Sequence, residues 1–506
     1  MITRLRMVPY IFAERVCPFL LLALLGLSST MVFSQAPEVS SGCWAAWKGS
    51  APAEEMLTSI RAQYAADLKG IKFNNYALQR AVVEDRKELQ TDLLKSLEDE
   101  QFIFGTPLNA LLDSVMDLLV GGNPEIVRPR LLLSWYPWPN ASCRGEGTIV
   151  VDLGLMERIR TRSELAFVMA HELAHQQLDH VNSSIVQVNQ HLLSKEFKAE
   201  VRATMRKEYN RVAELERLFV GFSVNERRHS RNHEIAADSL GLIFLLHTPF
   251  DPAAALSTMD MLDRCDNERD SLPIDAHWAF EYPGVAFDAR WTGLRTVSSL
   301  AAVDTRDHVL EDSLKTHPDC MKRKRVLAAE LSDTLPGNWA AESTAYEPYA
   351  HMSSYATIES AFRSDDAGRA IFLALQLLKS DPGNAYLNAA LARGFATLSV
   401  CAAEHRLSHV LDQPTKRQAR SYAQLLQALN DMRISDMGAL ADHYLSMARA
   451  TDPRCEDTVY TTALLAYGRK NATDLDQAKS DYLSTFPDGR LTERIGELTL
   501  APPAKH

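Results

Sequence analysis

The distribution of apolar positions divides the chain into three parts. Residues 19–27 form one uninterrupted apolar run, whereas helix-favouring segments and at least one β-branched run alternate over residues 60–345. After about Tyr355 the chain consists of alanine- and leucine-rich segments with few strand formers. A chain of 506 residues can bury more than one core. We therefore predict two folded domains, at residues 35–345 and 346–506, with an α+β fold that is mostly helical.

The first domain contains a strand pattern followed closely by a helix pattern. Residues 145–152 have a β-branched centre bounded by glycine, which predicts a short strand. Thr161 and Glu164 form a capping-box pattern, and the apolar residues after them recur at helical spacing. A helix is therefore expected to begin near Arg162.

This predicted helix carries the residues His171-Glu172-Leu173-Ala174-His175. Two histidines four apart lie on one helix face and can bind one metal ion, and the acid between them then lies beside the water that the metal activates. A catalytic zinc site needs three protein ligands and one open position. The alternative interpretation is a buried helix whose two histidines are satisfied by other partners.

A third ligand is available 59 residues after His175. Glu234 and Asp238 are four residues apart and share a helix face. Glu234 can complete the metal site, and Asp238 can orient a ligand histidine through a hydrogen bond.

The two segments together resemble the signature of the zinc metallopeptidase family that includes HtpX, the CaaX prenyl protease and periplasmic BepA-type proteases. In that family a HExxH helix is followed by Ser-Arg-x-x-Glu-x-x-Ala-Asp, and residues 230–238 contain every fixed position of the second motif. The resemblance implies a gluzincin-type metallopeptidase domain that binds one Zn²⁺ per chain. It implies that His171, His175 and Glu234 are the metal ligands, with Glu172 as the general base.

A third motif of the family is a Thr-His-Pro turn with an arginine six residues after the histidine. The chain has Thr316-His317-Pro318 followed by Arg323. The resemblance implies that His317 lies near the metal, either to stabilise the oxyanion or as a fourth ligand that keeps the enzyme latent. The family usually has an aliphatic residue straight after the arginine, but this chain has Lys324 and then Arg325. Either Arg323 or Arg325 is therefore expected to face the site.

The resemblance also implies that the strand over residues 145–152 is the edge strand that receives an extended substrate by backbone pairing. The alternative is an ordinary buried hairpin strand. Two further histidines are not expected to bind the metal. His180 is five residues after His175 and out of helical phase with it, so it should face away, and His233 should point elsewhere on its helix than Glu234.

The N-terminus predicts export. Three arginines precede the apolar run and small residues follow it, which is typical of a signal peptide at residues 1–34. The run is shorter than the about 20 residues of a membrane span, although an uncleaved anchor is the alternative. No later apolar segment reaches that length, which argues against a membrane-embedded prenyl-protein protease. We expect an exported protein, in the periplasm according to the resemblance.

Cysteine content and charge add two expectations. Six cysteines remain outside the signal peptide, so an exported chain is expected to form disulfides, of which Cys265–Cys320 and Cys401–Cys455 are the candidate pairs. Buried thiols are the alternative. The formal charge of −11 becomes about −13 when the signal peptide with its net +2 is removed. An acidic surface argues against nucleic acid as a partner.

Two polar stretches interrupt the first domain. Residues 181–228 carry mixed charges and predict a solvated helical hairpin, either as a cover over the cleft or as a plain insertion. Residues 263–306 are rich in aromatic side chains and predict a loop-rich segment that gates access or packs on the domain.

The second domain has a repeat-like punctuation. Prolines at 382, 414, 453 and 487 are separated by 32, 39 and 34 residues, a period typical of tetratricopeptide-like helical pairs. Residues 367–378 and 385–398 fit one such pair. The alternative is a generic α-helical domain.

Together these patterns predict an exported zinc endopeptidase that hydrolyses misfolded or unassembled envelope proteins. Its helical repeats would bind unfolded substrates or an outer-membrane assembly machinery. The alternative function is a non-proteolytic periplasmic holdase or scaffold that acts through the repeats.

Overall fold

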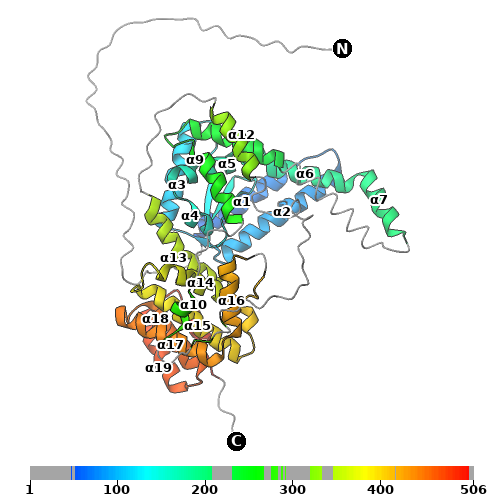
Figure 1. Ribbon diagram of the computed structural model, residues 1–506. Coiled ribbons are helices and arrows are strands. Elements are labelled where there is room, and N and C mark those ends of the chain that lie inside the picture. Colours follow the sequence, from blue (N-terminus) through cyan, green and yellow to red (C-terminus); the bar gives the residue numbers. More distant parts are fainter. Residues whose placement is uncertain are drawn as a thin grey trace, which may run out of the picture. The chain divides into compact units, whose positions relative to one another are not determined.

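The computed structural model describes residues 47, 52–207, 231–266, 275–282, 287–288, 291, 320–332, 346–415 and 418–500 (Figure 1). The predicted signal peptide and His317 lie outside these residues. The described part is mostly helical and contains a four-stranded sheet. Within it, no helix combines the length and the apolar character needed to cross a membrane.

The sheet has the strand order β1-β2-β4-β3. Its strands are β1 (Phe102–Ile103), β2 (Arg130–Ser134), β3 (Ala141–Cys143) and β4 (Thr148–Asp152). The central pair, β2 and β4, is parallel, whereas β1 pairs antiparallel with β2 and β3 pairs antiparallel with β4. Gly145 and Gly147 in the β3–β4 hairpin have φ of +76° and +89°, backbone conformations that are unfavourable for residues with a Cβ atom.

The predicted strand over residues 145–152 exists as β4, but it is not an edge strand. It lies between β2 and β3, and all five of its residues are buried. The alternative of a buried hairpin strand is therefore correct for β4, because its parallel partner β2 covers the side that a substrate would need. The edge next to the motif helix is β3 instead.

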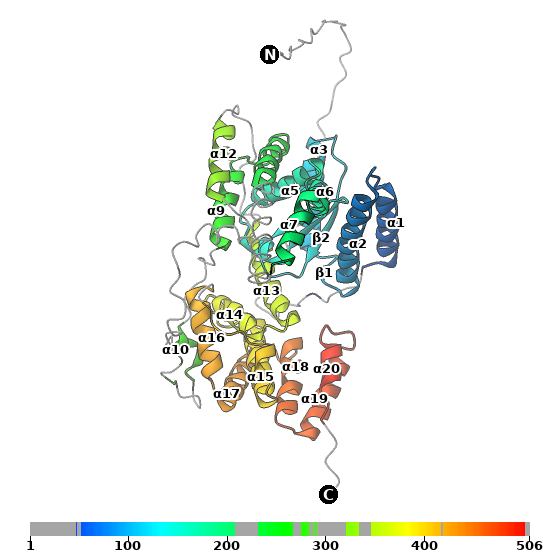
Figure 2. The ribbon, with the colours of Figure 1, turned by 90° about the vertical axis from the view of Figure 1, so that its right-hand side faces the viewer.

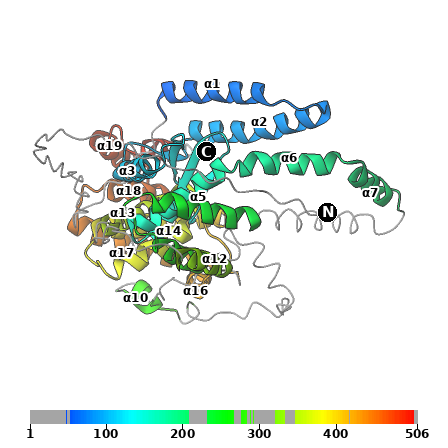
Figure 3. The same cartoon turned by 90° about the horizontal axis from the view of Figure 1, so that it is seen from above.

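Helices cover both faces of the sheet. Helices α1 (Glu54–Gly70) and α2 (Tyr76–Glu98) lie side by side, and their apolar residues pack on Leu132 and Val150 (Figure 3). On the opposite face, α3 (Pro107–Gly122) and α5 (Arg162–Gln177) pack on Leu133, Ile149 and Val151. The side chains of adjacent strand residues point to opposite faces. This alternation places the motif helix α5 directly on the sheet.

The capping box predicted the start of α5 correctly. The Thr161 side chain accepts a hydrogen bond from the backbone N–H of Glu164 at 3.1 Å, and the Glu164 carboxylate accepts one from the backbone N–H of Arg160 at 2.8 Å. The first bond satisfies an N–H group that a helix start leaves without a partner, and the second fixes the residue before the cap. The helix ends at Gln177, and Asp179 follows in the left-handed conformation with φ of 53°.

Further helices complete the first half of the chain. They are α4 (Leu153–Arg158), α6 (His180–Leu193), α7 (Lys195–Met205), a helix over residues 231–246, α9 (Ala254–Asp266) and α12 (Cys320–Ser332). Helix α6 runs away from α5 towards α7 (Figure 3) and contacts α2, where Asn189 donates a hydrogen bond to Asp85 at 2.6 Å. The polar stretch after residue 180 is therefore helical as far as it is described.

The described residues of the second half of the chain form a bundle of packed helices (Figure 2). It comprises α13 (Glu347–Arg363), α14 (Ala367–Leu378), α15 (Ala385–Ala403), η4 (Leu407–His409), α16 (Arg420–Asp431), α17 (Ile434–Thr451), α18 (Glu456–Gly468), α19 (Ala472–Thr485) and α20 (Thr492–Glu497). The predicted helical pair at residues 367–378 and 385–398 corresponds to α14 and α15, which pack on each other.

Helix α13 contributes to two cores. Its residues Met352 and Ala356 belong to the core around α5, whereas Ile358 and Phe362 belong to the core of the helical bundle. Just before this helix, Tyr346 donates a hydrogen bond to the carbonyl of Met156 at 2.8 Å. The second half of the chain is thus anchored to the first through buried contacts.

The aromatic segment between α9 and α12 packs on the helical bundle as far as it is described. Helix α10 (Ala276–Phe280) buries Phe280 in the core of the bundle. Nearby, the hydroxyl groups of Tyr282 and Tyr444 are 2.9 Å apart. The segment was expected to gate access or to pack on the first domain, but these contacts join its described residues to the helical bundle instead.

The predicted disulfide pairs are wrong. Cys265, Cys320 and Cys401 are thiols, as is Cys143, and Cys455 is disulfide-bonded. Sharing a domain was the only basis for the predicted pairs, and it does not bring two cysteine Cα atoms to within the about 7 Å that a disulfide requires.

Candidate metal centre

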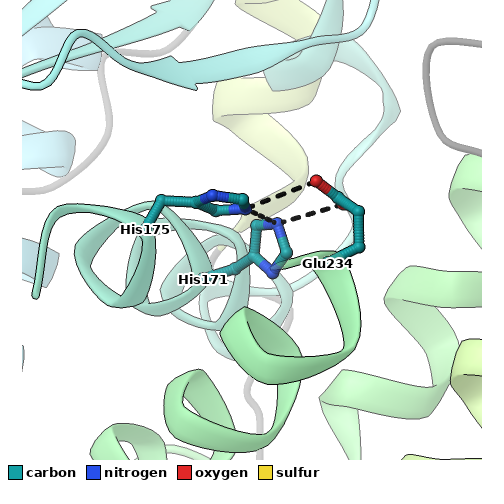
Figure 4. Close-up of side chains that lie close together, drawn as sticks. All are labelled: His171, His175 and Glu234. Carbon is teal, nitrogen blue, oxygen red and sulfur yellow. Dashed lines mark hydrogen bonds and ion pairs between the residues drawn. The ribbon is translucent and has the colours of Figure 1, made fainter. Parts of the chain in front are cut away.

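Helix α5 directs His171 and His175 to the same side, where Glu234 from the 231–246 helix meets them (Figure 4). The Nε2 atoms of the two histidines are 3.0 Å apart. The Glu234 carboxylate oxygens lie 3.6 Å from His171 Nε2 and 3.4 Å from His175 Nε2. These three side chains can therefore hold one metal ion.

The spacing of the three ligand atoms fits zinc. Ligand atoms about 2.1 Å from a tetrahedral metal are separated by about 3.4 Å from one another. The two Nε2 atoms are 3.0 Å apart, and they lie 3.6 and 3.4 Å from two different oxygens of Glu234, so the separations are close to that value. Two imidazole nitrogens and one carboxylate oxygen are also the donor types that zinc takes in catalytic sites, with a fourth position left for water or substrate.

Asp238 and Arg323 contact the candidate ligands on the side that faces away from the proposed metal position. Asp238 Oδ1 lies 2.9 Å from His171 Nδ1, the ring nitrogen that does not face the other ligands. Arg323, from α12, donates two hydrogen bonds of 2.7 Å to Asp238, and its Nη1 lies 2.9 Å from Glu234 Oε2. The guanidinium group thus fixes one metal ligand and the residue that orients another.

Of the two candidate arginines, Arg323 is the one whose side chain contacts the centre. Arg323 is 2% exposed, whereas Arg325 is exposed on the same helix. Lys324 forms an ion pair of 2.7 Å with Asp260 on α9, away from these contacts. The family position after the arginine is thus used here to join α12 to α9.

The electrostatic environment favours a cation. Burial lowers the pKa of His171, but Asp238 and Glu234 outweigh burial and raise that pKa to about 10. Burial raises the pKa of Glu234, yet its contacts with the two histidines lower it well below its usual value. The negative potential that would hold a proton on His171 would equally stabilise a divalent metal ion.

Glu172 occupies a buried position beside the edge of the sheet. It is 8% exposed, and its Oε2 accepts a hydrogen bond of 2.7 Å from the backbone N–H of Cys143 in β3. This bond restrains the carboxylate that the motif predicts as the general base. The role of the Cys143 backbone was not expected from the sequence, because a backbone donor has no residue-type signature.

Close helix packing sets the approach of Glu234 to the histidines. Gly241 lies on the 231–246 helix, and a Cβ atom added there would be 3.0 Å from the backbone nitrogen of His171. Only glycine allows the two helix backbones to come this close without displacement. The glycine lies two turns after Glu234 on the same helix.

His180 contradicts the expectation that it faces away from the centre. Its Nδ1 is 3.1 Å from Nδ1 of His175, and its ring stacks on His233 with centroids 4.1 Å apart and planes at 8°. The phase argument failed because α5 ends before His180. The left-handed residue Asp179 turns the chain, and His180 is the first residue of α6.

The geometry brings together six of the seven residues predicted for the site: His171, His175, Glu234, Asp238, Glu172 and Arg323. His317, the seventh, lies outside the described residues. His180 was expected to face away from the site, and His233 to lie either at the surface or behind the ligands; the stack of His233 on His180 matches the second of these.

A His-Glu-x-x-His helix that meets a glutamate from a second helix defines the class of zinc metallopeptidases. In agreement with this class, residues 131–331 match the model of Peptidase family M48, so this segment, from β2 to α12, is a peptidase domain of that family. Peptidases of the family depend on zinc, which indicates metalloprotease activity. Among curated proteins, none matches the chain.

Proposed function

We propose that the protein is an exported zinc-dependent endopeptidase that hydrolyses peptide bonds of misfolded or unassembled envelope proteins. The observation that carries the proposal is the convergence of three candidate ligand side chains, His171, His175 and Glu234, together with a buried carboxylate, Glu172, between the two histidines on one helix. A purely structural zinc site does not require such a carboxylate. This favours catalysis over the holdase or scaffold alternative.

When bound, zinc supplies a Lewis acid that polarises a carbonyl group and makes water nucleophilic near neutral pH. Glu172 accepts a proton from the attacking water and delivers it to the leaving amine nitrogen. Asp238 holds the ring of His171 through Nδ1, and Arg323 holds Asp238 and Glu234 in position. The family resemblance implies that His317, which lies outside the described residues, would either assist the oxyanion or serve as a fourth ligand that holds the enzyme latent.

Strand β3 is the proposed site of substrate capture. It is an edge strand among the described residues, and it lies next to the general base through the bond between Cys143 and Glu172. A polypeptide that pairs with β3 would bring its backbone past this carboxylate. Because main-chain hydrogen bonds supply the affinity in such pairing, unfolded chains of many sequences are suitable substrates.

The cellular role rests on the N-terminal pattern and on the helical half of the chain. The charged and apolar order of residues 1–34 supports export to the periplasm, and a disulfide at Cys455 suits an oxidising compartment. We infer that helices α13 to α20 are tetratricopeptide-like repeats, which dock substrates or the outer-membrane assembly machinery.

The test is cleavage of an unfolded protein by the purified mature chain. The His317→Ala variant is used as the parent, so that a latent fourth ligand does not hide activity. We expect this parent to cleave an unfolded protein such as reduced casein and to lose activity with a chelator. Adding Glu172→Gln should lower the rate by about 10²-fold or more, because the general base is removed.

Glu172→Gln is a matched change because its amide oxygen can still accept the hydrogen bond from Cys143. Zinc content measured by mass spectrometry should remain at one ion per chain in both proteins. Zinc binding without cleavage by the His317→Ala parent would refute the peptidase proposal for such substrates and favour the holdase.

A further inference from the structure

The imidazole rings of His180 and His233 lie immediately behind the candidate metal ligands. His180 is 8% exposed, and its ring meets that of His175 edge-on, with centroids 4.9 Å apart. The closest atoms are the two Nδ1 nitrogens, at 3.1 Å. The contact is thus made by the ring nitrogen of His175 that does not face the other ligands.

The direction of this hydrogen bond follows from the ligand geometry. His175 Nε2 points at His171 Nε2 and at Glu234, so a metal in the centre would take the lone pair of Nε2. The proton of a neutral imidazole must then be on Nδ1, which makes His175 the donor. His180 Nδ1 is therefore the acceptor that fixes the tautomer and the ring angle of His175.

The stack between His180 and His233 connects this acceptor to the third ligand. His233 directly precedes Glu234 on the 231–246 helix, and its ring is parallel to that of His180 within 8°. Through the two rings, the first residue of α6 contacts the helix that provides Glu234.

The two ligand histidines differ in their supporting partners. His171 has the carboxylate of Asp238, which is itself held by Arg323, whereas His175 has the imidazole of His180. Both partners contact the Nδ1 atom. A histidine ligand without such a partner rotates more freely and binds metal more weakly.

We propose that His180 is a positioning residue of the metal centre: its Nδ1 accepts the Nδ1–H of His175 and thereby fixes the ring of this ligand. The inference rests on the metal centre of the proposed function. It requires zinc to bind but does not require proteolysis.

Two substitutions of His180 separate the acceptor from the shape of the ring. His180→Asn places an amide oxygen close to the position of Nδ1 and keeps the acceptor, but it removes the ring. His180→Phe keeps a ring that can stack on His233 but has no acceptor. A role in positioning and a role in packing therefore predict opposite orders for the two variants.

The measurement is the zinc dissociation constant of the full mature chain by competition with a chromogenic chelator. Both variants carry Glu172→Gln, which removes the general base. We expect His180→Phe to bind zinc about 10–100-fold more weakly than the Glu172→Gln parent, and His180→Asn to remain within about threefold of it. The absorption bands of the cobalt-substituted protein should shift in the Phe variant and stay in place in the Asn variant.

Unchanged zinc affinity in His180→Phe, or affinity in His180→Asn that is as weak as in the Phe variant, would overturn the inference. Thermal unfolding of the metal-free proteins detects a folding defect in either variant. Failure here is distinguishable from failure of the proposed function, because cleavage is measured on the His317→Ala protein, which keeps Glu172. Cleavage by that protein, together with a zinc affinity that is insensitive to His180, refutes only the positioning role. No cleavage by that protein, together with the expected order of affinities, refutes only the peptidase.

Discussion

Replacing Arg323 with methionine tests the electrostatic support of the metal centre. Methionine keeps an unbranched side chain of similar length on α12 but removes the charge and every donor. The substitution takes two hydrogen bonds of 2.7 Å from Asp238 and a contact of 2.9 Å from Glu234. Both carboxylates then remain at the centre without the guanidinium group that neutralises them.

The size of the stability loss in Arg323→Met can be estimated from the burial of the two carboxylates. Removing one partner of a buried ion pair costs about 3–5 kcal/mol because the other charge is left uncompensated. Asp238 is 1% exposed and cannot be reached by water, but it keeps its contact with His171. The Glu234 side chain is 20% exposed, so water can solvate part of its charge. We therefore expect a loss of about 3 kcal/mol, at the lower end of the range, in the metal-free protein.

The assay is urea unfolding in the presence of a chelator, followed by circular dichroism and repeated with saturating zinc. The loss should be smaller with zinc, because the cation restores positive charge next to Glu234. Arg325→Met is the matched control: it lies on the same helix and is exposed, so it should change stability by less than about 0.5 kcal/mol. A loss below about 1 kcal/mol for Arg323→Met, or an equal loss for Arg325→Met, would refute the reasoning.

Three further substitutions test other features of the structure. Gly241→Ala forces the 231–246 helix away from His171, so it should lower the free energy of unfolding in urea by about 1–3 kcal/mol and weaken zinc binding in chelator competition. The control is Gly438→Ala, whose added Cβ makes only an ordinary contact of 3.7 Å and should not destabilise the protein. Equal effects of the two substitutions would contradict this account. Burial raises the pKa of Asp152 from 3.8 to about 6, so the free energy of unfolding should fall as pH rises through this interval. Asp152→Asn should abolish this pH dependence and stabilise the protein at pH 7 by up to about 3 kcal/mol. An Asn variant that is no more stable than the parent at pH 7 would contradict this expectation. Burial raises the pKa of Asp457, but two buried arginines outweigh burial and lower this pKa below 3.8. Asp457→Asn should therefore lower the free energy of unfolding by about 3–5 kcal/mol at pH 7, and this difference from the parent should shrink as pH falls below 3.8. A difference in stability that does not depend on pH would contradict the expectation.

Features of the site that depend on local spacing could be predicted from the sequence. The cap at Thr161, the helix after it and the shared face of His171 and His175 all follow from residues within one or two helical turns. Glu234 could be connected with them through its spacing and the resemblance to a family motif. The spacing of apolar residues within one helix does not show which other helix packs against it.

Features that depend on chain pairing could not be predicted. The sequence shows that residues 148–152 favour a strand, but not that β2 pairs with it in parallel and turns β4 into an interior strand. His180 was placed wrongly because a single left-handed residue, Asp179, ends the helical phase. Aspartate is one of the residues that adopt the left-handed conformation most often, but an aspartate in the sequence does not by itself show that a helix ends there. The disulfide pairs failed for the related reason that shared domain membership does not specify distance.

The contact between His180 and His233 also has a consequence for how this domain can diversify. The two rings lie 4.1 Å apart although 52 residues separate them along the chain, so the intervening segment begins and ends at one fixed point beside the metal centre. The free energy of closing such a segment changes by only about 0.6 kcal/mol when its length is halved or doubled. Evolution or design can therefore exchange the segment for a shorter loop, a different cover or a whole inserted domain. Each replacement would be presented to substrates at the same place, while the three ligands keep their spacing.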